Sequence, residues 1–187
     1  MKAIAITAIA GLAAAASAGN TINVNFAATA SEINVGDTVN WTAVVTADYT
    51  DASAYLGGFV GDFVASDSSL GTAGNWVSNF SGNATTPSVN GASVEGINSF
   101  NSALLGTDDS GLTMAFSWSV TADAEGLLDY SSSGTWSYFG DDGIFSLPDE
   151  YDAQSANITS DRVSIVPAPG ALALLGLGGL IAGRRRG

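Results

Sequence analysis

The sequence predicts an all-β domain, an antiparallel β-sandwich, on three observations. Apolar and polar residues alternate in several short segments, no segment shows a convincing amphipathic-helix pattern, and Ser, Thr, Asn, Asp and Gly fill the stretches between them. The domain is expected over residues 19–165. Residues 1–18 and 166–187 are set apart because they are rich in Ala, Gly and Leu. The chain of 187 residues is long enough for one such domain.

The clearest strand is predicted at residues 112–122, where every even position is apolar and the odd positions are small or hydroxylated. Residues 35–45 show the same alternation on odd positions. Weaker strands are predicted at residues 22–26, 55–63 and 163–165, and residues 128–138 suggest either two strands or one long bent strand. Six or seven short strands separated by turn residues favour a sandwich.

Residues 66–110 break this pattern. They are rich in Gly, Ser, Asn and Thr, yet they contain large apolar residues such as Trp76, Phe80 and Ile97. A disordered linker would contain fewer of these. We therefore expect a long irregular insertion that packs on the sandwich, with a helical turn near Ile97–Leu105. Insertions of this length often carry binding surfaces.

The predicted domain is strongly acidic. Its only basic residue is Arg162 against 18 acids, so its formal net charge is −17, compared with −13 for the whole chain. This charge repels phosphate backbones and argues against nucleic-acid binding. It can serve solubility, or it can attract divalent cations or a cationic polymer.

The chain contains neither Cys nor His. Their absence excludes Cys/His metal sites and catalysis by Ser-His-Asp or Cys-His groups. We find no catalytic residue and no required cofactor, and we expect a protein that is not an enzyme.

Residues 1–18 have the features of a cleavable signal peptide. Lys2 supplies a positive start, residues 3–16 are apolar, and Ala16-Ser17-Ala18 is an A-x-A site that places the mature start at Gly19. The alternative, a membrane anchor or buried helix, is less well supported because the stretch is short for a span.

The other end has three parts in order. Val166-Pro167-Ala168-Pro169 is followed by an apolar segment at residues 170–183 and by Arg184, Arg185 and Arg186. The prolines keep the motif extended, the apolar segment can form a short transmembrane helix, and the arginines stop transfer on the cytoplasmic side.

This tail resembles the PEP-CTERM sorting domain, in which Val-Pro-Glu-Pro precedes a Leu/Gly-rich helix and an Arg cluster. Ala168 stands where that family usually has Glu. The resemblance implies processing by an exosortase in a Gram-negative envelope, with signal peptidase as the other processing partner. The precursor would be anchored in the inner membrane and the product would reach the cell surface or extracellular matrix. The alternative is an ordinary C-terminal anchor.

A second, local resemblance concerns architecture. Val35-Gly36-Asp37-Thr38-Val39, followed by alternating residues, resembles the opening of immunoglobulin-like and cohesin-like sandwich domains. Such a resemblance carries no function by itself.

Two sets of residues are candidates for ligand binding. Acidic side chains in predicted turns after the Trp136 strand could hold Ca²⁺, which prefers carboxylate and carbonyl oxygens, although solvated turn charges explain them as well. These are Asp141, Asp142, Asp149, Glu150 and Asp152. Trp76 lies in the predicted insertion and could stack on a sugar at the surface, whereas Trp41 and Trp118 are expected in the core.

These observations favour an exported structural or adhesive protein of the envelope or matrix. The alternative is a surface module that binds carbohydrate, such as extracellular polysaccharide, or another protein, with or without Ca²⁺. A hydrolase is the third possibility, and the missing His and Cys argue against it.

Overall fold

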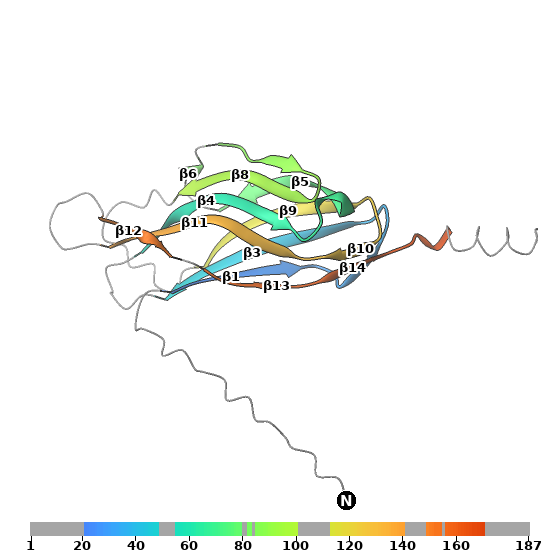
Figure 1. Cartoon of the computed structure of the whole chain (residues 1–187), viewed down its shortest axis with the longest axis horizontal. Coiled ribbons are helices and arrows are strands. Elements are labelled where there is room, and N and C mark those ends of the chain that lie inside the picture. The colour runs from blue at the N-terminus through green and yellow to red at the C-terminus, as the bar shows by residue number, and fades with distance from the viewer. Residues whose placement is uncertain are drawn as a thin grey trace, which may run out of the picture.

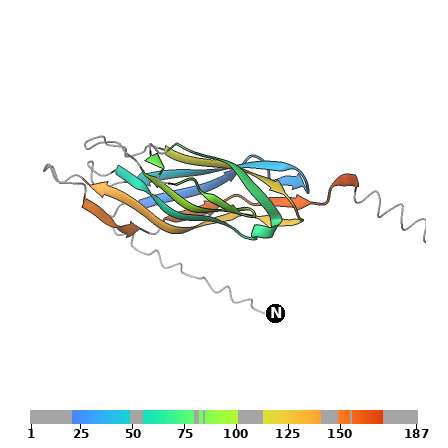
Figure 2. The same ribbon diagram turned by 90° about the horizontal axis from the view of Figure 1, so that it is seen from above.

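The computed structural model describes residues 21–48, 55–79, 82–83, 85–100, 113–140, 149–154 and 156–170. These residues form β-strands that run along the long axis of the molecule in two stacked sheets (Figure 1, Figure 2). The predicted all-β sandwich is therefore confirmed for the described part of the chain.

The first sheet has five strands in the order β13-β1-β3-β9-β5. Their bounds are Asn157–Ser160, Thr21–Ala28, Thr38–Asp48, Thr113–Ala122 and Gly71–Ser78. Strands β3 and β9 are the two with the clearest alternation, and they pair in the middle of this sheet with Trp41 opposite Trp118.

The second sheet has the order β12-β11-β4-β8-β6, and β7 also pairs with β8. The bounds are Asp149–Gln154, Tyr130–Gly140, Tyr55–Ala65, Ser93–Phe100, Gly82–Asn83 and Ser88–Asn90. A small third sheet, β10-β14-β2, joins Gly126–Leu128, Val163–Val166 and Glu32–Asn34.

Two strand pairs are parallel, which corrects the expectation of a wholly antiparallel sandwich. Strand β13 runs parallel to β1, and β14 runs parallel to β2. Both pairs join the last described strands to the first ones. Alternation of side chains reports which face is buried, but it carries no information on strand direction.

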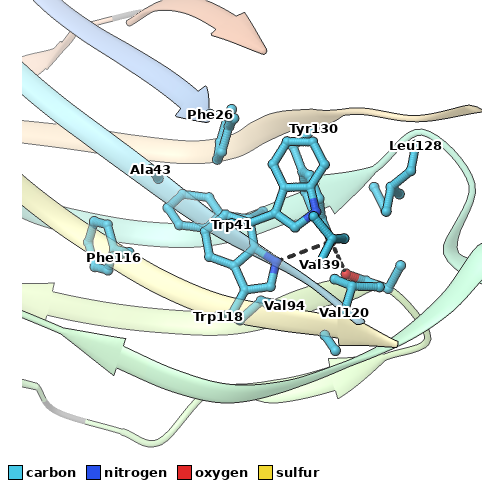
Figure 3. Packing of buried hydrophobic residues seen from close by; sticks show 14 of the residues in the cluster. Phe26, Val39, Trp41, Ala43, Val94, Phe116, Trp118, Val120, Leu128 and Tyr130 are labelled. Carbon is cyan, nitrogen blue, oxygen red and sulfur yellow. Dashed lines mark hydrogen bonds between the residues drawn. The ribbon is translucent and has the colours of Figure 1, made fainter. Parts of the chain in front are cut away.

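Aromatic rings fill the space between the sheets (Figure 3). Trp41 and Trp118 lie stacked with their ring centroids 6.5 Å apart, and Tyr130 packs edge-on against both. Trp118 Nε1 donates a hydrogen bond to the Tyr130 hydroxyl at 3.2 Å, and that hydroxyl donates to the Ala92 carbonyl at 2.6 Å. Burial raises the pKa of the Tyr130 hydroxyl, so it stays protonated.

The described residues between 66 and 100 are not the irregular insertion that the sequence predicts. They contain a 3₁₀ turn, η1 (Ser68–Leu70), and strands of both sheets, and residues 97–100 belong to strand β8 rather than to a helical turn. Residues 101–105 of the predicted turn lie outside the described residues. The alternation of apolar and polar residues is not visible in this segment because each of its two long strands, β5 and β8, contains a bulge.

The two bulges reverse the alternation within their strands. In β5, Asn75 has a φ of 53° and the register with β9 shifts between Gly74 and Val77. In β8, Gly96 has a φ of 71° at the register shift against β4. An extra residue at a bulge moves the following side chains to the opposite face, so period two fails across it.

The Val35–Val39 motif forms the turn from β2 to β3. Gly36 has a φ of 93°, which glycine adopts at no steric cost, and Asp37 N donates to the Asn34 carbonyl at 3.0 Å. The Asp37 carboxylate accepts from the Asn34 side chain at 2.8 Å and from its backbone N at 3.0 Å. These hydrogen bonds lower the pKa of Asp37.

Candidate binding surface

The outer face of the second sheet exposes apolar side chains. In β4, Phe59, Phe63 and Ala65 face the core, so the alternate residues Val60 and Val64 face outward, where they are 56% and 37% exposed. We call this surface the β4 face. It is formed by the outward side chains of β11, β4 and β8.

Phe100 adds a ring to the β4 face. It lies opposite Gly58 in the register of β4 with β8, and it is 42% exposed. A Cβ at Gly58 would overlap the Ser99 carbonyl, so only glycine permits this close approach of the two strands. Phe100 lies diagonally next to Val60, and Val64 lies further along β4 on the same face, with Asp62 between the two valines. We call Phe100, Val60 and Val64 the apolar strip.

Polar groups border the apolar strip. On β11, Thr135 lies opposite Val60, Ser133 opposite Asp62, and Ser131 opposite Val64. Asp62 Oδ1 accepts a hydrogen bond from Gly96 N at 2.8 Å, so the bulge of β8 holds this carboxylate in place. The β4 face can offer apolar contact with hydroxyl donors and acceptors around it.

The β4 face was not predicted from the sequence. The available signal was that Val60 and Val64 alternate with Phe59 and Phe63, which places apolar residues on both faces of β4. A strand that is apolar on both faces is buried on both or has a partner for its outer one.

Trp76 does not stand free on the surface. The bulge at Asn75 turns it toward the core, where its ring lies 5.3 Å from Phe116 and 6.0 Å from Phe63, centroid to centroid. The side chain is half-buried. One part of the ring is packed, which leaves less of it for sugar stacking than the sequence analysis assumed.

The predicted Ca²⁺ site stays a prediction, because the described structure does not contain the whole set of ligands. Asp141 and Asp142 lie outside the described residues, and Asp149, Glu150 and Asp152 belong to strand β12 rather than to a turn. Across the described ranges, no group of three or more acidic residues could hold a metal ion.

The predicted processing segments lie at or beyond the ends of the sandwich. Val166 is the last residue of β14, and its carbonyl accepts a hydrogen bond from Val35 N at 2.9 Å. Pro167 and Ala168 are half-buried and Pro169 is exposed. Ala16, Ala18, Gly19, Arg184, Arg185 and Arg186 lie outside the described residues. In the part of the chain that is described, no helix has the length and apolar character needed to cross a bilayer.

A shallow groove of about 270 Å³ lies at the turns after β1 and β13, and it contains the only basic residue of the predicted domain. Arg162 Nε lies 3.2 Å from Asp129 Oδ2, and the arginine side chain is 66% exposed. Asp129 thus neutralises the Arg162 guanidinium at an open surface, where an ion pair contributes little to the free energy of unfolding. The β4 face remains the better candidate for binding.

No family model matches the chain, and no curated protein matches it. Solved structures of cohesins are similar in fold. The seventh ScaB type I cohesin from Pseudobacteroides cellulosolvens has a TM-score of 0.50 at 16% identity, over 79% of this chain and 94% of that one. A chain of a type I cohesin–dockerin complex from Clostridium thermocellum has a TM-score of 0.50 at 10% identity, over 78% and 99%.

A chain of a second complex, CaDoc0917 with CaCohA2, has a TM-score of 0.50 at 14% identity, over 78% of this chain and 100% of that one. At these identities the similarity shows the fold alone. The described part of the chain is thus a β-sandwich similar in fold to cohesins, in agreement with the local resemblance at Val35–Val39.

Proposed function

We propose that this chain is a non-enzymatic, protein-binding module that is exported and held at the cell surface or in the extracellular matrix. The observation that carries the proposal is the apolar strip of Val60, Val64 and Phe100 on an open sheet face. Exposed apolar side chains that gather on one face mark interaction sites in soluble proteins.

The size of the β4 face supports a protein as the partner. A stable interface covers about 800 Å² on each partner. Strands β4 and β11 each have 11 residues. With β8, three neighbouring strands about 5 Å apart and about 3.3 Å per residue give a flat area of roughly 500 Å², enough for the centre of such an interface. Two of the structures with a similar fold are complexes of a cohesin with a dockerin, which further supports a protein partner.

Export and sorting rest on the two ends of the sequence. Strand β1 begins at Thr21, so removal of residues 1–18 would leave the sandwich intact. Strand β14 ends at Val166, where the PEP-CTERM-like motif begins. We propose that signal peptidase acts before β1 and that an exosortase acts after β14 in a Gram-negative cell.

The alternative function is carbohydrate binding through Trp76, with or without Ca²⁺. It receives less support, because the Trp76 ring packs partly on Phe116 and Phe63.

A site-specific photo-crosslinker tests the β4 face on intact cells that export the full chain. Placed at position 60, it should give one defined protein adduct, and Val64→Asp in the same chain should reduce that adduct about tenfold because a charge would enter an apolar contact. The matched control is position 89, where Val89 is 51% exposed on β7. Equal adducts at positions 60 and 89, or an adduct unaffected by Val64→Asp, would contradict the proposal.

A further inference from the structure

Over residues 23–27, 38–46 and 115–121, the outward side chains of the three central strands of the first sheet carry no charge, and the one acid in these strands, Asp48, is the last residue of β3. This outer face is formed by residues that alternate with the core residues of β1, β3 and β9, and we call it the neutral face. Its members are Asn23, Asn25, Ala27, Thr38, Asn40, Thr42, Val44, Thr46, Ala115, Ser117, Ser119 and Thr121. All of these except Ser119 are exposed or half-buried.

The absence of charge on this face contrasts with the composition of the chain, which has 18 acids. On the second sheet, the β4 face contains Asp62, and Glu95 lies on neighbouring β8. On the first sheet, hydroxyl and amide groups occupy most of the outward positions, and the apolar members, Ala27, Val44 and Ala115, are small or medium in size.

Side-chain hydrogen bonds between strands hold the neutral face in order. At the edge next to β13, Asn157 Nδ2 donates to Asn23 Oδ1 at 3.1 Å, and Thr159 Oγ1 donates to Asn25 Oδ1 at 2.9 Å. Toward β9, the hydroxyls of Thr38 and Thr121 lie 2.9 Å apart. Groups that are already ordered lose less conformational entropy when a ligand binds.

A second set of bonds orders the edge next to β5. Asn75 Nδ2 donates to Ser119 Oγ at 2.9 Å, and Ser119 Oγ donates to the Gly74 carbonyl at 3.3 Å. The bulge at Asn75 thus keeps a buried hydroxyl satisfied at this edge of the face.

Acidic residues lie at the ends of these strands. Asp37 precedes β3, Asp123 follows β9 and accepts from Thr72 Oγ1 at 2.7 Å, and Asp161 follows β13 and accepts from Ala28 N at 3.0 Å. Asp48 ends β3 at the opposite end of the sheet. An anionic ligand would be repelled by these acids, and a cationic ligand would find carboxylates only at the strand ends. The charge distribution therefore fits an uncharged ligand.

We propose that the neutral face binds an uncharged, linear polysaccharide. Amide and hydroxyl side chains can both donate to and accept from sugar hydroxyls, and the small apolar residues between them can contact the CH groups of a sugar ring. The face offers no aromatic ring for stacking, so each sugar is held weakly and the affinity comes from many units of one polymer. The proposal is independent of the β4 face, because the two surfaces belong to opposite sheets (Figure 1).

Affinity electrophoresis of the full chain tests this proposal with two uncharged polymers, hydroxyethylcellulose and dextran, and with alginate as the anionic one. At least one uncharged polymer should retard the chain, and alginate should not. Asn25→Asp combined with Asn40→Asp should weaken binding about tenfold, because it places charges on the face with little change of shape. Thr42→Val, which keeps the shape and removes a hydroxyl, should weaken it less.

The matched control is Thr86→Asp with Ser88→Asp, which adds the same charge at exposed positions away from the neutral face. It should bind as the unaltered chain does. The proposal fails if neither uncharged polymer retards the chain, or if the control loses binding equally. It also fails if sedimentation shows a dimer that Asn25→Asp with Asn40→Asp dissociates, because the face would then join two copies. The photo-crosslinking result at position 60 does not affect the electrophoresis result. The protein-binding proposal for the β4 face and the polysaccharide proposal for the neutral face can therefore fail independently.

Discussion

Tyr130 shows how a single polar atom organises the core. Its ring packs on Phe26, Trp41 and Trp118, and its hydroxyl joins Trp118 Nε1 to the Ala92 carbonyl. The alternation of apolar residues correctly placed Trp41 and Trp118 in the core. The hydrogen-bond partners could not be predicted, because Ala92 is 38 residues from Tyr130 in the chain and belongs to a segment with no visible period.

Tyr130→Phe should destabilise the domain by about 1–3 kcal/mol, because it removes one hydroxyl and leaves a buried indole N–H and a buried carbonyl without this partner. The ring volume is retained, so the loss reports hydrogen bonding rather than packing. Urea unfolding of the purified chain, followed by tryptophan fluorescence, measures the change. A loss below about 0.5 kcal/mol would show that water or a rearranged neighbour replaces the hydroxyl.

At the scale of elements, the bulges in β5 and β8 set the orientation of side chains at the two proposed binding faces. Asn75 turns Trp76 inward and orders the edge of the neutral face, while Gly96 lets its backbone N–H bind Asp62 on the β4 face. Both positions require φ above zero, which Asn and Gly adopt more readily than other residues.

Gly96→Ala should destabilise the domain by about 1–2 kcal/mol, because a Cβ at a φ of 71° is strained even though no atom lies within 4 Å of it. Gly96→Asn is the matched control. Asn tolerates a positive φ better than Ala does, so this variant should lose less free energy of unfolding than Gly96→Ala. The midpoints of urea unfolding give the comparison. Equal losses for the two variants would mean that the cost does not arise from φ.

The limit of sequence-based prediction in this chain lies at these same bulges. Strands β3 and β9 were predicted because their alternation is unbroken over the paired region. Strands β5 and β8 were missed because their buried positions include Ala73, Ser93 and Ser99, and because one bulge in each reverses the pattern. Small and hydroxylated core residues look like turn residues when their partners are not known.

At the scale of the whole molecule, the sandwich separates the two predicted processing segments from the binding faces. Strand β1 starts at Thr21 and strand β14 ends at Val166, so the strands of the β4 face and of the neutral face lie between the two predicted segments in the sequence. Removal of the predicted segments would leave every strand of both faces in the chain.

The mass of the mature protein tests both processing steps at once. In a cell with an exosortase, we expect a product that begins at Gly19 and lacks the Arg184–Arg186 cluster; without the exosortase, the product should begin at Gly19 and keep Gly187. Pro167→Ala with Pro169→Ala should give the second result in both cells, because the extended motif would be altered. A product that starts at Met1, or that keeps Gly187 in both cells, would contradict the signal-peptide or the sorting prediction respectively.

The position of β14 also sets how the domain stands on whatever anchors it. The chain leaves β14 at one tip of the long axis (Figure 1), and Val166 is hydrogen-bonded to Val35 with no slack before Pro167. If the proposed tether is attached at this tip, the long axis of the sandwich would stand upright on the anchoring surface. The β4 face and the neutral face would then both be directed sideways, so ligands beside the domain could reach either face.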